Sequence, residues 1–168
     1  MRYTLANLDK FPQLKQERTL GCIPTSIAAI MTYYGARNWN EAEIYDEVAR
    51  KLQPGESFCF AVFKKHYLDV HLGKDFRSDT QGFGENFVAW RHFIVDKLGI
   101  GTPVIASFSY LGDGPHVMTV LEGDTGTTSL MLHDPATGDF RILDMERTAL
   151  ERINLRRNND VLWIERAK

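Results

Sequence analysis

An uncharged stretch from residue 23 to residue 36 has the spacing of a buried helix. Its large apolar side chains recur at helical intervals, and alanines fill much of the remaining surface: Ile23, Ile27, Ile30, Met31 and Tyr34. Pro24 suits the first helical position, where a missing N–H costs nothing, and Gly35 is a suitable end. The pattern therefore predicts a helix buried on most sides, with Cys22 at its N-terminus.

Three further segments with apolar residues at helical intervals predict helices in the first part of the chain. The first covers residues 41–52 and follows Asn40, a favourable N-cap residue. The others cover residues 58–70 and 85–98, and glycines follow the last of them. Residues 73–84 lie between these two segments and are rich in glycine and polar residues, so we expect a loop there.

The pattern changes from helical to strand-like after residue 102. Five short segments predict strands, at residues 103–110, 116–122, 129–134, 140–144 and 161–165. A short helix is predicted between the last two strands, over residues 145–153. Helices followed by an antiparallel sheet indicate an α+β fold, and a chain of 168 residues is typical of a single domain.

Composition and charge narrow the classes of function. The 20 lysines and arginines nearly balance the 22 aspartates and glutamates, so the net charge is −2 and no nucleic-acid or membrane partner is expected. The first residues lack the apolar core of a signal peptide, and no stretch approaches the length of a membrane span. With two cysteines, Cys22 and Cys59, we expect a cytoplasmic protein with reduced thiols, although export without a signal peptide would leave the same pattern.

Cys22 has the surroundings of a reactive thiol. At the start of a helix, the unpaired backbone N–H groups and the positive end of the helix dipole favour a thiolate. Gln16 lies six residues before Cys22, and its side-chain N–H could hold a tetrahedral oxyanion together with the backbone N–H of the cysteine. Gln13 is a weaker candidate for the same role. A cysteine nucleophile also needs a base, and His116 opens a strand directly after a glycine-rich turn.

The motif Gly-Cys-x-Pro-Thr-Ser at residues 21–26 is followed by an apolar helix that ends in Tyr-Tyr-Gly. With Gln16 ahead of it, this motif resembles the bacteriocin-processing (double-glycine) peptidase-like family of papain-like cysteine peptidases. His116 and the pair Asp134–Pro135 stand where that family would have its histidine and its acid. The resemblance implies a papain-like fold, with the nucleophile helix packed on the sheet that carries the base, and hydrolysis of a peptide bond. Many relatives have Cys-Gly-Pro, whereas this chain has Ile23 after the cysteine, so cleavage after small residues does not transfer directly.

The expected strand register predicts that His116 and Asp134 lie next to each other. If the hairpin between the second and third strands is symmetric about Thr125, opposed residues have numbers that sum to 250. His116 then faces Asp134, with side chains about 5 Å apart, and His133 points to the opposite face. In this interpretation Cys22 attacks the carbonyl carbon and pairs with His116 as a thiolate–imidazolium pair. Asp134 fixes the ring, with Asp113 and Asp124 as the next candidates for the acid.

Other interpretations of the same residues define the alternatives. Cys59 stands between two phenylalanines, and we expect it to be buried and unreactive. A zinc site built on Cys22 and His116 lacks the paired spacing of zinc ligands, so we expect no metal and no other cofactor. The expected partner is a peptide or protein substrate. An acyl or amide transferase would use the same triad, and a peptide-binding domain without catalysis is the third alternative.

Overall fold

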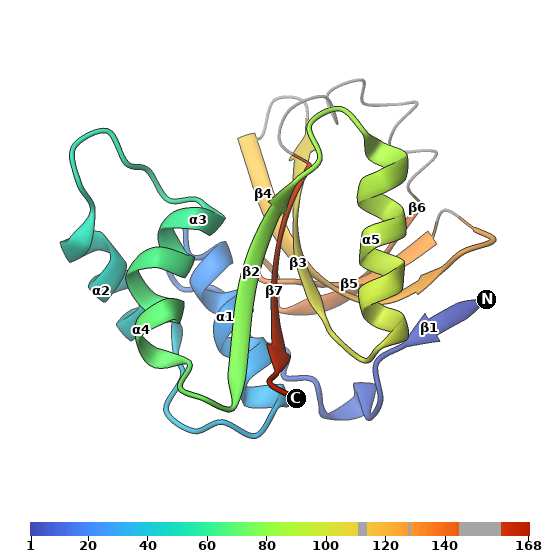
Figure 1. The fold of residues 1–168 in the computed structure, drawn as a ribbon, viewed down its shortest axis with the longest axis horizontal. Helices are drawn as coiled ribbons and strands as arrows, with labels where there is room; N and C mark the ends of the chain where they lie inside the picture. Colours follow the sequence, from blue (N-terminus) through green and yellow to red (C-terminus); the bar gives the residue numbers. More distant parts are fainter. Residues whose placement is uncertain (111–113, 128, 145–158) are drawn as a thin grey trace.

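The computed structural model describes residues 1–110, 114–127, 129–144 and 159–168 of the chain (Figure 1). Within these ranges, seven strands form one antiparallel sheet with the order β2-β7-β3-β4-β5-β6, and β1 pairs with β4 off this path. The strands are β1 (Arg2–Thr4), β2 (Phe76–Gly82), β3 (Val104–Tyr110), β4 (Gly114–Asp124), β5 (Ser129–Asp134), β6 (Asp139–Asp144) and β7 (Asp160–Arg166). All five strands predicted from the alternating pattern are present, which confirms an α+β fold.

The helices fall into two groups. Figure 1 shows α1 to α4 gathered at one side of the molecule, while α5 lies apart from them along the strands. The helical segments are η1 (Leu8–Lys10), α1 (Cys22–Tyr33), α2 (Glu41–Lys51), α3 (Phe60–Phe63), the π-helical η2 (Lys64–Leu68), α4 (Asp69–His71) and α5 (Phe87–Gly99). The helices predicted over residues 41–52, 58–70 and 85–98 are confirmed, although a π-helical turn divides the second into three pieces.

Helix α1 is buried over most of its surface. Nine of its 12 residues are buried, and they form one continuous run from Ile23 to Met31. The helix begins at Cys22 and is closed by Gly35, whose φ of 83° lets the chain turn back and bond to the last helical carbonyls. Because so much of α1 lies in the core, the packing of the whole domain fixes the position of Cys22.

The segment from residue 73 to residue 84 was predicted as a loop, and this prediction is wrong. Strand β2 lies within it and pairs with β7 over its whole length, from Phe76 opposite Arg166 to Gly82 opposite Asp160. Phe76 is the one large apolar residue of the strand, so no alternation of apolar and polar residues marks it. Strand β2 is held at the edge of the sheet by its backbone hydrogen bonds to β7. The strand propensity of its own residues does not reveal that pairing.

The β4–β5 hairpin has a different register from the one predicted. Near the turn, opposed residues sum to 253, as for Glu122 and Met131, whereas farther along they sum to 252, as for Thr119 and His133. The predicted sum of 250 is therefore wrong, and His116 does not lie directly opposite Asp134. The change from 253 to 252 marks one extra residue, Leu121, which forms a β-bulge on β4.

This bulge decides which face of the sheet His116 occupies. An odd sum would place His116 and Asp134 on opposite faces, because side chains alternate along each strand. The even sum of 252 beyond the bulge returns both residues to one face. The predicted shared face is confirmed by the contact between their side chains, described below, although the register behind the prediction was wrong.

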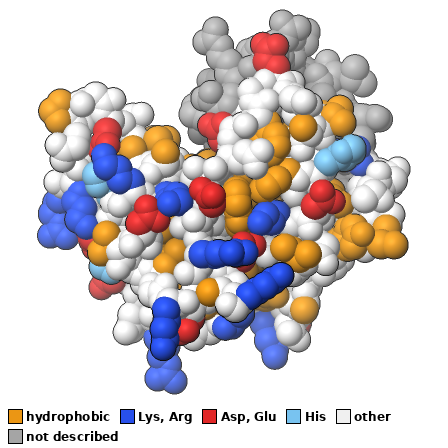
Figure 2. All heavy atoms as spheres, viewed as in Figure 1, with side chains coloured by type: hydrophobic (Ala, Val, Ile, Leu, Met, Phe, Trp, Pro, Cys, Tyr) orange, Lys and Arg blue, Asp and Glu red, His pale blue; other side chains and the backbone are white. Residues whose placement is uncertain are grey.

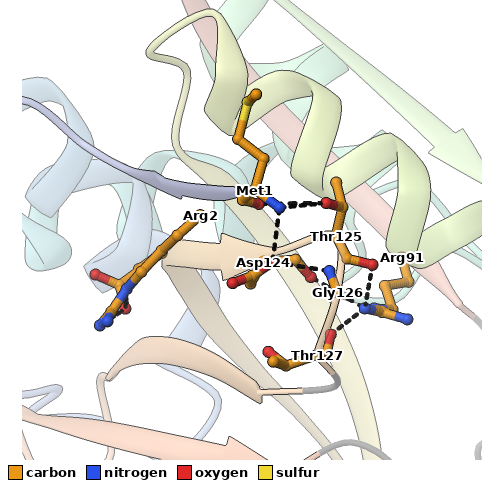
Figure 3. A network of polar contacts seen from close by, with 8 residues as sticks. Met1, Arg2, Arg91, Asp124, Thr125, Gly126 and Thr127 are labelled. Atoms are coloured by element: carbon orange, nitrogen blue, oxygen red, sulfur yellow. Dashed lines mark hydrogen bonds and ion pairs between the residues drawn. The ribbon is translucent and has the colours of Figure 1, made fainter.

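A polar network holds the β4–β5 turn (Figure 3). The Met1 amino group donates to Asp124 Oδ1 at 3.0 Å and to Thr125 Oγ1 at 2.7 Å. Arg91 of α5 donates through Nη2 to the Asp124 carbonyl at 3.0 Å and to a further carbonyl of the same turn. These bonds tie the turn to β1 and α5, and they accompany a hairpin centred beyond Thr125, later than predicted.

The surface carries charges of both signs side by side. On the face shown in Figure 2, Lys and Arg side chains lie among Asp and Glu side chains. Ion pairs join the two signs, and Glu165 of β7 binds Arg77 at 2.6 Å and Lys97 at 3.1 Å. Within the described residues, none of the helices has the length and apolar character needed to cross a membrane.

Two predictions fall outside the described residues. The short helix predicted over residues 145–153 lies there, as do residues 112 and 113 of the glycine-rich turn that precedes His116. The alternative acid Asp113 belongs to the same undescribed turn. The candidate site is therefore built from the described residues on either side of these gaps.

Candidate active site

A carboxylate from α2 fixes the loop that leads into α1. Glu41 accepts the backbone N–H of Glu17 at 2.7 Å and that of Arg18 at 3.0 Å. A Cβ atom at Gly21 would overlap Glu41 Oε1 and come within 2.8 Å of the Arg18 carbonyl oxygen. Only glycine fits into this space without displacing a neighbour, which explains the glycine that precedes Cys22.

Cys22 is the first residue of α1 and is partly buried. Burial raises the pKa of its thiol, while the backbone N–H groups of Ile23, Val117 and Cys22 itself offset part of that rise. The net change is upward, so the neutral thiol is favoured. This differs from the thiolate that we expected from the helix start, because desolvation by the surrounding core outweighs the nearby N–H groups.

The Val117 N–H brings strand β4 to the sulfur of Cys22. Thr119 is the first residue of β4 that pairs with β5, so the Val117 N–H lies on the stretch of β4 before that pairing begins. Val117 directly follows His116 in the chain, which places the candidate base next to the residue that contacts the sulfur. Among the described residues, no hydrogen bond joins the sulfur to the His116 ring, and the thiolate–imidazolium pair stays a prediction.

His116 and Asp134 are in direct contact. His116 Nε2 lies 2.7 Å from Asp134 Oδ1, and the side chains are 22% and 2% exposed, respectively. A carboxylate only accepts hydrogen bonds, so Nε2 carries the proton and Nδ1 of the neutral ring is the acceptor. Within the described part of the protein, Nδ1 has no hydrogen-bond partner. The ring is therefore oriented by the acid and keeps one nitrogen available for a proton.

Three donors converge on the buried Asp134 carboxylate. Besides His116, Arg141 donates to Oδ2 at 2.5 Å and the Ala136 N–H donates to Oδ1 at 2.9 Å. Burial alone would raise the pKa of Asp134, but the hydrogen bonds from Arg141, His116 and Ala136 outweigh it and lower the pKa below its usual value. Asp134 is therefore an anion at neutral pH, as a partner for an imidazolium must be.

Arg141 is the member of this cluster that the sequence reasoning missed. It lies on β6 opposite Leu132, so strand alternation puts it on the same sheet face as Asp134, which pairs with Asp139. The signal was available in the sequence, because a tight turn after Asp134–Pro135 pairs residues whose numbers sum to 273. Applying this register to β6 would have placed a basic side chain beside the candidate acid.

Gln16 is hydrogen-bonded both to the segment that follows Asp134 and to the loop that precedes Cys22. Its backbone N–H donates to the Pro135 carbonyl at 2.7 Å, which ties it to the residue after Asp134. Its Nε2 donates to the Arg18 carbonyl at 3.0 Å, and the same carbonyl accepts the Gly21 N–H at 2.9 Å. The amide group of Gln16 is thus held at the loop that immediately precedes Cys22, while Gln13 is exposed.

Cys59 was expected to be buried, and this expectation is wrong. It is exposed because it lies at the N-cap position of α3, outside the helix, where the chain enters from a loop. Cys59 also lines a cavity of about 160 Å³ together with Cys22. The other lining residues are Leu20, Ile23, Phe58, Phe60, Ser107, Val117 and Asp160. Both thiols of the chain therefore face one cavity at the start of α1.

His133 has a structural role in the core. It is fully buried, its Nε2 atom lies 2.9 Å from the Leu14 carbonyl, and Phe11 packs against its ring. Burial lowers its pKa, so the ring is neutral. The prediction that His133 points away from the face of Asp134 is confirmed. The two residues are neighbours on β5, where successive side chains point to opposite faces, and His133 pairs with Thr119 of β4.

The described residues contain no cluster of three or more His, Cys, Asp or Glu side chains that could hold a metal ion. The candidate site instead brings together a thiol, an imidazole, a carboxylate and an amide. This set can transfer an acyl group through a thioester without a metal, provided that the ring reaches the thiol.

Comparison with known proteins identifies the family. A family model for the Peptidase_C39-like family matches residues 8–154. The chain belongs to the Peptidase_C39-like family. The resemblance drawn from the cysteine motif is thereby confirmed, and the matched range includes Gln16, Cys22, His116 and Asp134. A search of curated protein sequences finds no significant match.

A solved structure shares the fold of this Peptidase_C39-like protein. The crystal structure of the peptidase domain of Streptococcus ComA, a bifunctional ABC transporter involved in a quorum-sensing pathway, matches with a TM-score of 0.62. The match covers 92% of this chain and 97% of that chain at 14% sequence identity. At this identity the likeness shows the fold, which is papain-like as predicted, and does not by itself show the activity.

Proposed function

We propose that the protein is a cysteine peptidase that hydrolyses a peptide bond with Cys22 as nucleophile. The observation that carries the proposal is the 2.7 Å contact between His116 and Asp134. His116 lies on β4, and the N–H of the next residue on that strand, Val117, faces the Cys22 sulfur. Membership of a peptidase family supports a peptide or protein as the substrate. The roles of the individual residues follow from their contacts.

His116 acts as the base through Nδ1. In the first step the Cys22 sulfur attacks the carbonyl carbon while His116 Nδ1 takes the thiol proton. Neither a free thiolate nor a free imidazolium therefore accumulates before the attack. The raised pKa of the Cys22 thiol favours this concerted transfer over a preformed ion pair. The step requires Nδ1 to come within hydrogen-bond distance of the sulfur when a substrate is bound, as catalytic hydrogen bonds often do.

Asp134 and Gln16 stabilise the charges that develop. Asp134 holds the protonated ring at Nε2, and the Cys22 N–H and a Gln16 side-chain N–H are the donors for the oxyanion. The imidazolium then gives its proton to the leaving amine, and a thioester forms on Cys22. A water molecule, deprotonated by His116, attacks the thioester and releases the carboxylic acid and the free thiol.

The test is labelling of the protein by a peptide with an electrophilic carbonyl-type warhead, followed by mass mapping of the modified cysteine. We expect the label on Cys22, because binding of the peptide part presents the warhead to the nucleophile. Iodoacetamide, which has no peptide part, should react first with the exposed Cys59 and thus serves as the control reagent. Cys22→Ala should abolish both labelling by the peptide probe and turnover of a peptide library without changing the circular dichroism spectrum.

Two results would overturn this assignment. Labelling by the peptide probe at Cys59 alone would remove Cys22 from the mechanism. A wild-type protein that neither reacts with peptide probes nor cleaves any peptide of the library would be a peptide-binding domain without catalysis.

A further inference from the structure

The cavity that Cys22 and Cys59 share has apolar walls and one acidic residue, Asp160. Its volume of about 160 Å³ is similar to that of cavities of about 150 Å³ that hold a benzene molecule in another protein. A lysine or arginine side chain has a comparable number of heavy atoms. Among the described residues that line the cavity, none carries a positive charge.

Asp160 faces the cavity from the first position of β7. Its N–H donates to Ser107 Oγ at 3.1 Å, and Ser107 Oγ donates to its carbonyl at 3.3 Å, so its backbone is fixed against β3. The next residue, Val161, pairs with Ala106, and strand alternation therefore sends the Asp160 and Ser107 side chains to the same face. Val117 pairs with Ser107 and shares this face, where all three line the cavity with Cys22.

The Asp160 carboxylate has no counter-charge in the described part of the protein. No hydrogen bond or ion pair reaches its side chain there, and its Oδ1 lies close to the backbone of Gly82 on the neighbouring strand. Partial burial raises its pKa, since the charged form loses water without gaining a cation. A bound ammonium or guanidinium group would supply the missing charge.

A strained apolar residue forms part of the cavity wall. Leu20 has a φ of 66°, a conformation that costs energy for a branched side chain, and its side chain is 60% exposed although it is large and apolar. Leu20 lines the cavity with Ile23 and Val117. Such walls suit the aliphatic stem of a lysine or arginine, while the charged end of that side chain contacts a polar group such as Asp160.

We propose that this cavity binds a lysine or arginine side chain of the substrate, with the Asp160 carboxylate as its counter-charge. This inference rests on the proposed function, because it takes the cavity beside Cys22 as a subsite for the peptide. It adds a specificity that neither the motif at residues 21–26 nor the fold implies. A neutral polar side chain would also reach Asp160, but it would leave the carboxylate without a positive partner.

The first test measures charge selectivity at Cys22 and does not depend on turnover. In a Cys59→Ser background, the rates of reaction of Cys22 with aminoethyl, methyl and sulfonatoethyl methanethiosulfonate are compared at one pH and low salt. The protein unfolded in denaturant is the reference for intrinsic reactivity. We expect the ratio of the cationic to the anionic rate to be about tenfold higher in the folded protein than in the unfolded protein. This is the size of effect expected from one carboxylate at short range in a partly screened site.

Matched variants assign the selectivity to one carboxylate. Asp160→Asn should lower the ratio of cationic to anionic rates by about five- to tenfold, because it removes the charge and keeps the shape. Asp9→Asn makes the same charge change near the other end of α1, where Tyr33 bonds to the Ala6 carbonyl, and should leave the ratio unchanged. A helix of 12 residues separates these ends by about 18 Å, beyond the Debye length at physiological salt.

The second test uses peptides and separates failure of this inference from failure of the proposed function. Peptides that differ at one position by lysine, norleucine or glutamate are offered to the wild type and to Asp160→Asn. Preference for lysine over norleucine that disappears in Asp160→Asn supports the subsite. Cleavage without any such preference overturns the inference and leaves the peptidase intact. Charge selectivity that depends on Asp160, in a protein that cleaves no peptide, supports the cationic site and overturns the peptidase.

Discussion

Replacing Asp134 by asparagine removes one of two acceptor oxygens from a buried cluster of donors. Oδ1 accepts from His116 and the Ala136 N–H, while Oδ2 accepts from Arg141. An asparagine amide has a single acceptor oxygen, and if that oxygen stays at His116 its NH2 group faces the guanidinium of Arg141. The variant is therefore expected to keep the contact with the ring and to lose the contact with Arg141.

The loss of stability can be scaled from these contacts. A hydrogen bond to a charged group contributes about 1.5–3 kcal/mol, and leaving a buried group unpaired adds to its loss. The Arg141 side chain is 52% exposed, so water replaces part of its lost bond, and we expect a decrease in unfolding free energy of about 1–2 kcal/mol. For a protein of this size, that decrease lowers the melting temperature by about 2–8 °C.

The loss of activity should be much larger than the loss of stability. Asparagine orients the ring but provides no negative charge beside the imidazolium, and we expect kcat to fall by about 10²–10⁴-fold with little change in KM. The assay is peptide cleavage at one pH, with circular dichroism to verify folding. Asp139→Asn is the matched control, because Asp139 pairs with Asp134 across the β5–β6 hairpin but is exposed.

A second substitution separates the structural from the catalytic role of Asp134. In Asp134→Asn/Arg141→Gln, the glutamine oxygen can accept from the asparagine NH2 group, so the melting temperature should recover part of its loss. Activity should not recover, because the charge beside His116 is still missing. If folded Asp134→Asn retained kcat within about threefold of wild type, Asp134 would not be the acid of the site.

Two further predictions concern the nucleophile and its loop. Gly21→Ala should displace the Glu41 carboxylate and lower the unfolding free energy by about 2 kcal/mol in chemical denaturation; a cost undiminished in a Glu41→Ala background would contradict the overlap. Alkylation of Cys22 by iodoacetamide should rise with pH through a midpoint above the usual thiol value of about 8.5, since burial raises its pKa; a midpoint at or below that of the unfolded protein would contradict the buried thiol.

The parts of the fold that the sequence predicted are those whose signal is local. The burial of α1 follows from its uncharged apolar run, and the Asn40 side chain caps α2 by accepting the Glu43 N–H at 3.0 Å. The strands from β3 to β7 were predicted because short apolar segments replace the helical spacing there, and β7 is buried along most of its length, as expected for such a segment. Gln16, Cys22, His116 and Asp134 were chosen as candidates because their residue types and spacing are specific in combination, and the fold brings the last two into contact.

The parts that could not be predicted depend on partners distant in sequence. Strand β2 has one apolar anchor and exists through its pairing with β7, whose residues lie more than 70 positions away. Cys59 was placed in the core because two phenylalanines flank it, yet its position at the N-cap of α3 turns it to the surface. The pKa of Cys22 was expected to fall because the helix start was considered alone, and burial by the rest of the core was not visible.

The β4–β5 hairpin shows why the correct pair was found on a wrong register. Side-chain direction depends only on whether a register error is even or odd, so an error of two positions preserves the face and an error of one reverses it. The centre of the turn lies later than assumed, which by itself changes the sum from 250 to 253 and would turn His116 away from Asp134. The bulge at Leu121 lowers the sum to 252 and restores the shared face. The one extra residue on β4, more than the identity of the turn residues, therefore determines that the imidazole meets its carboxylate.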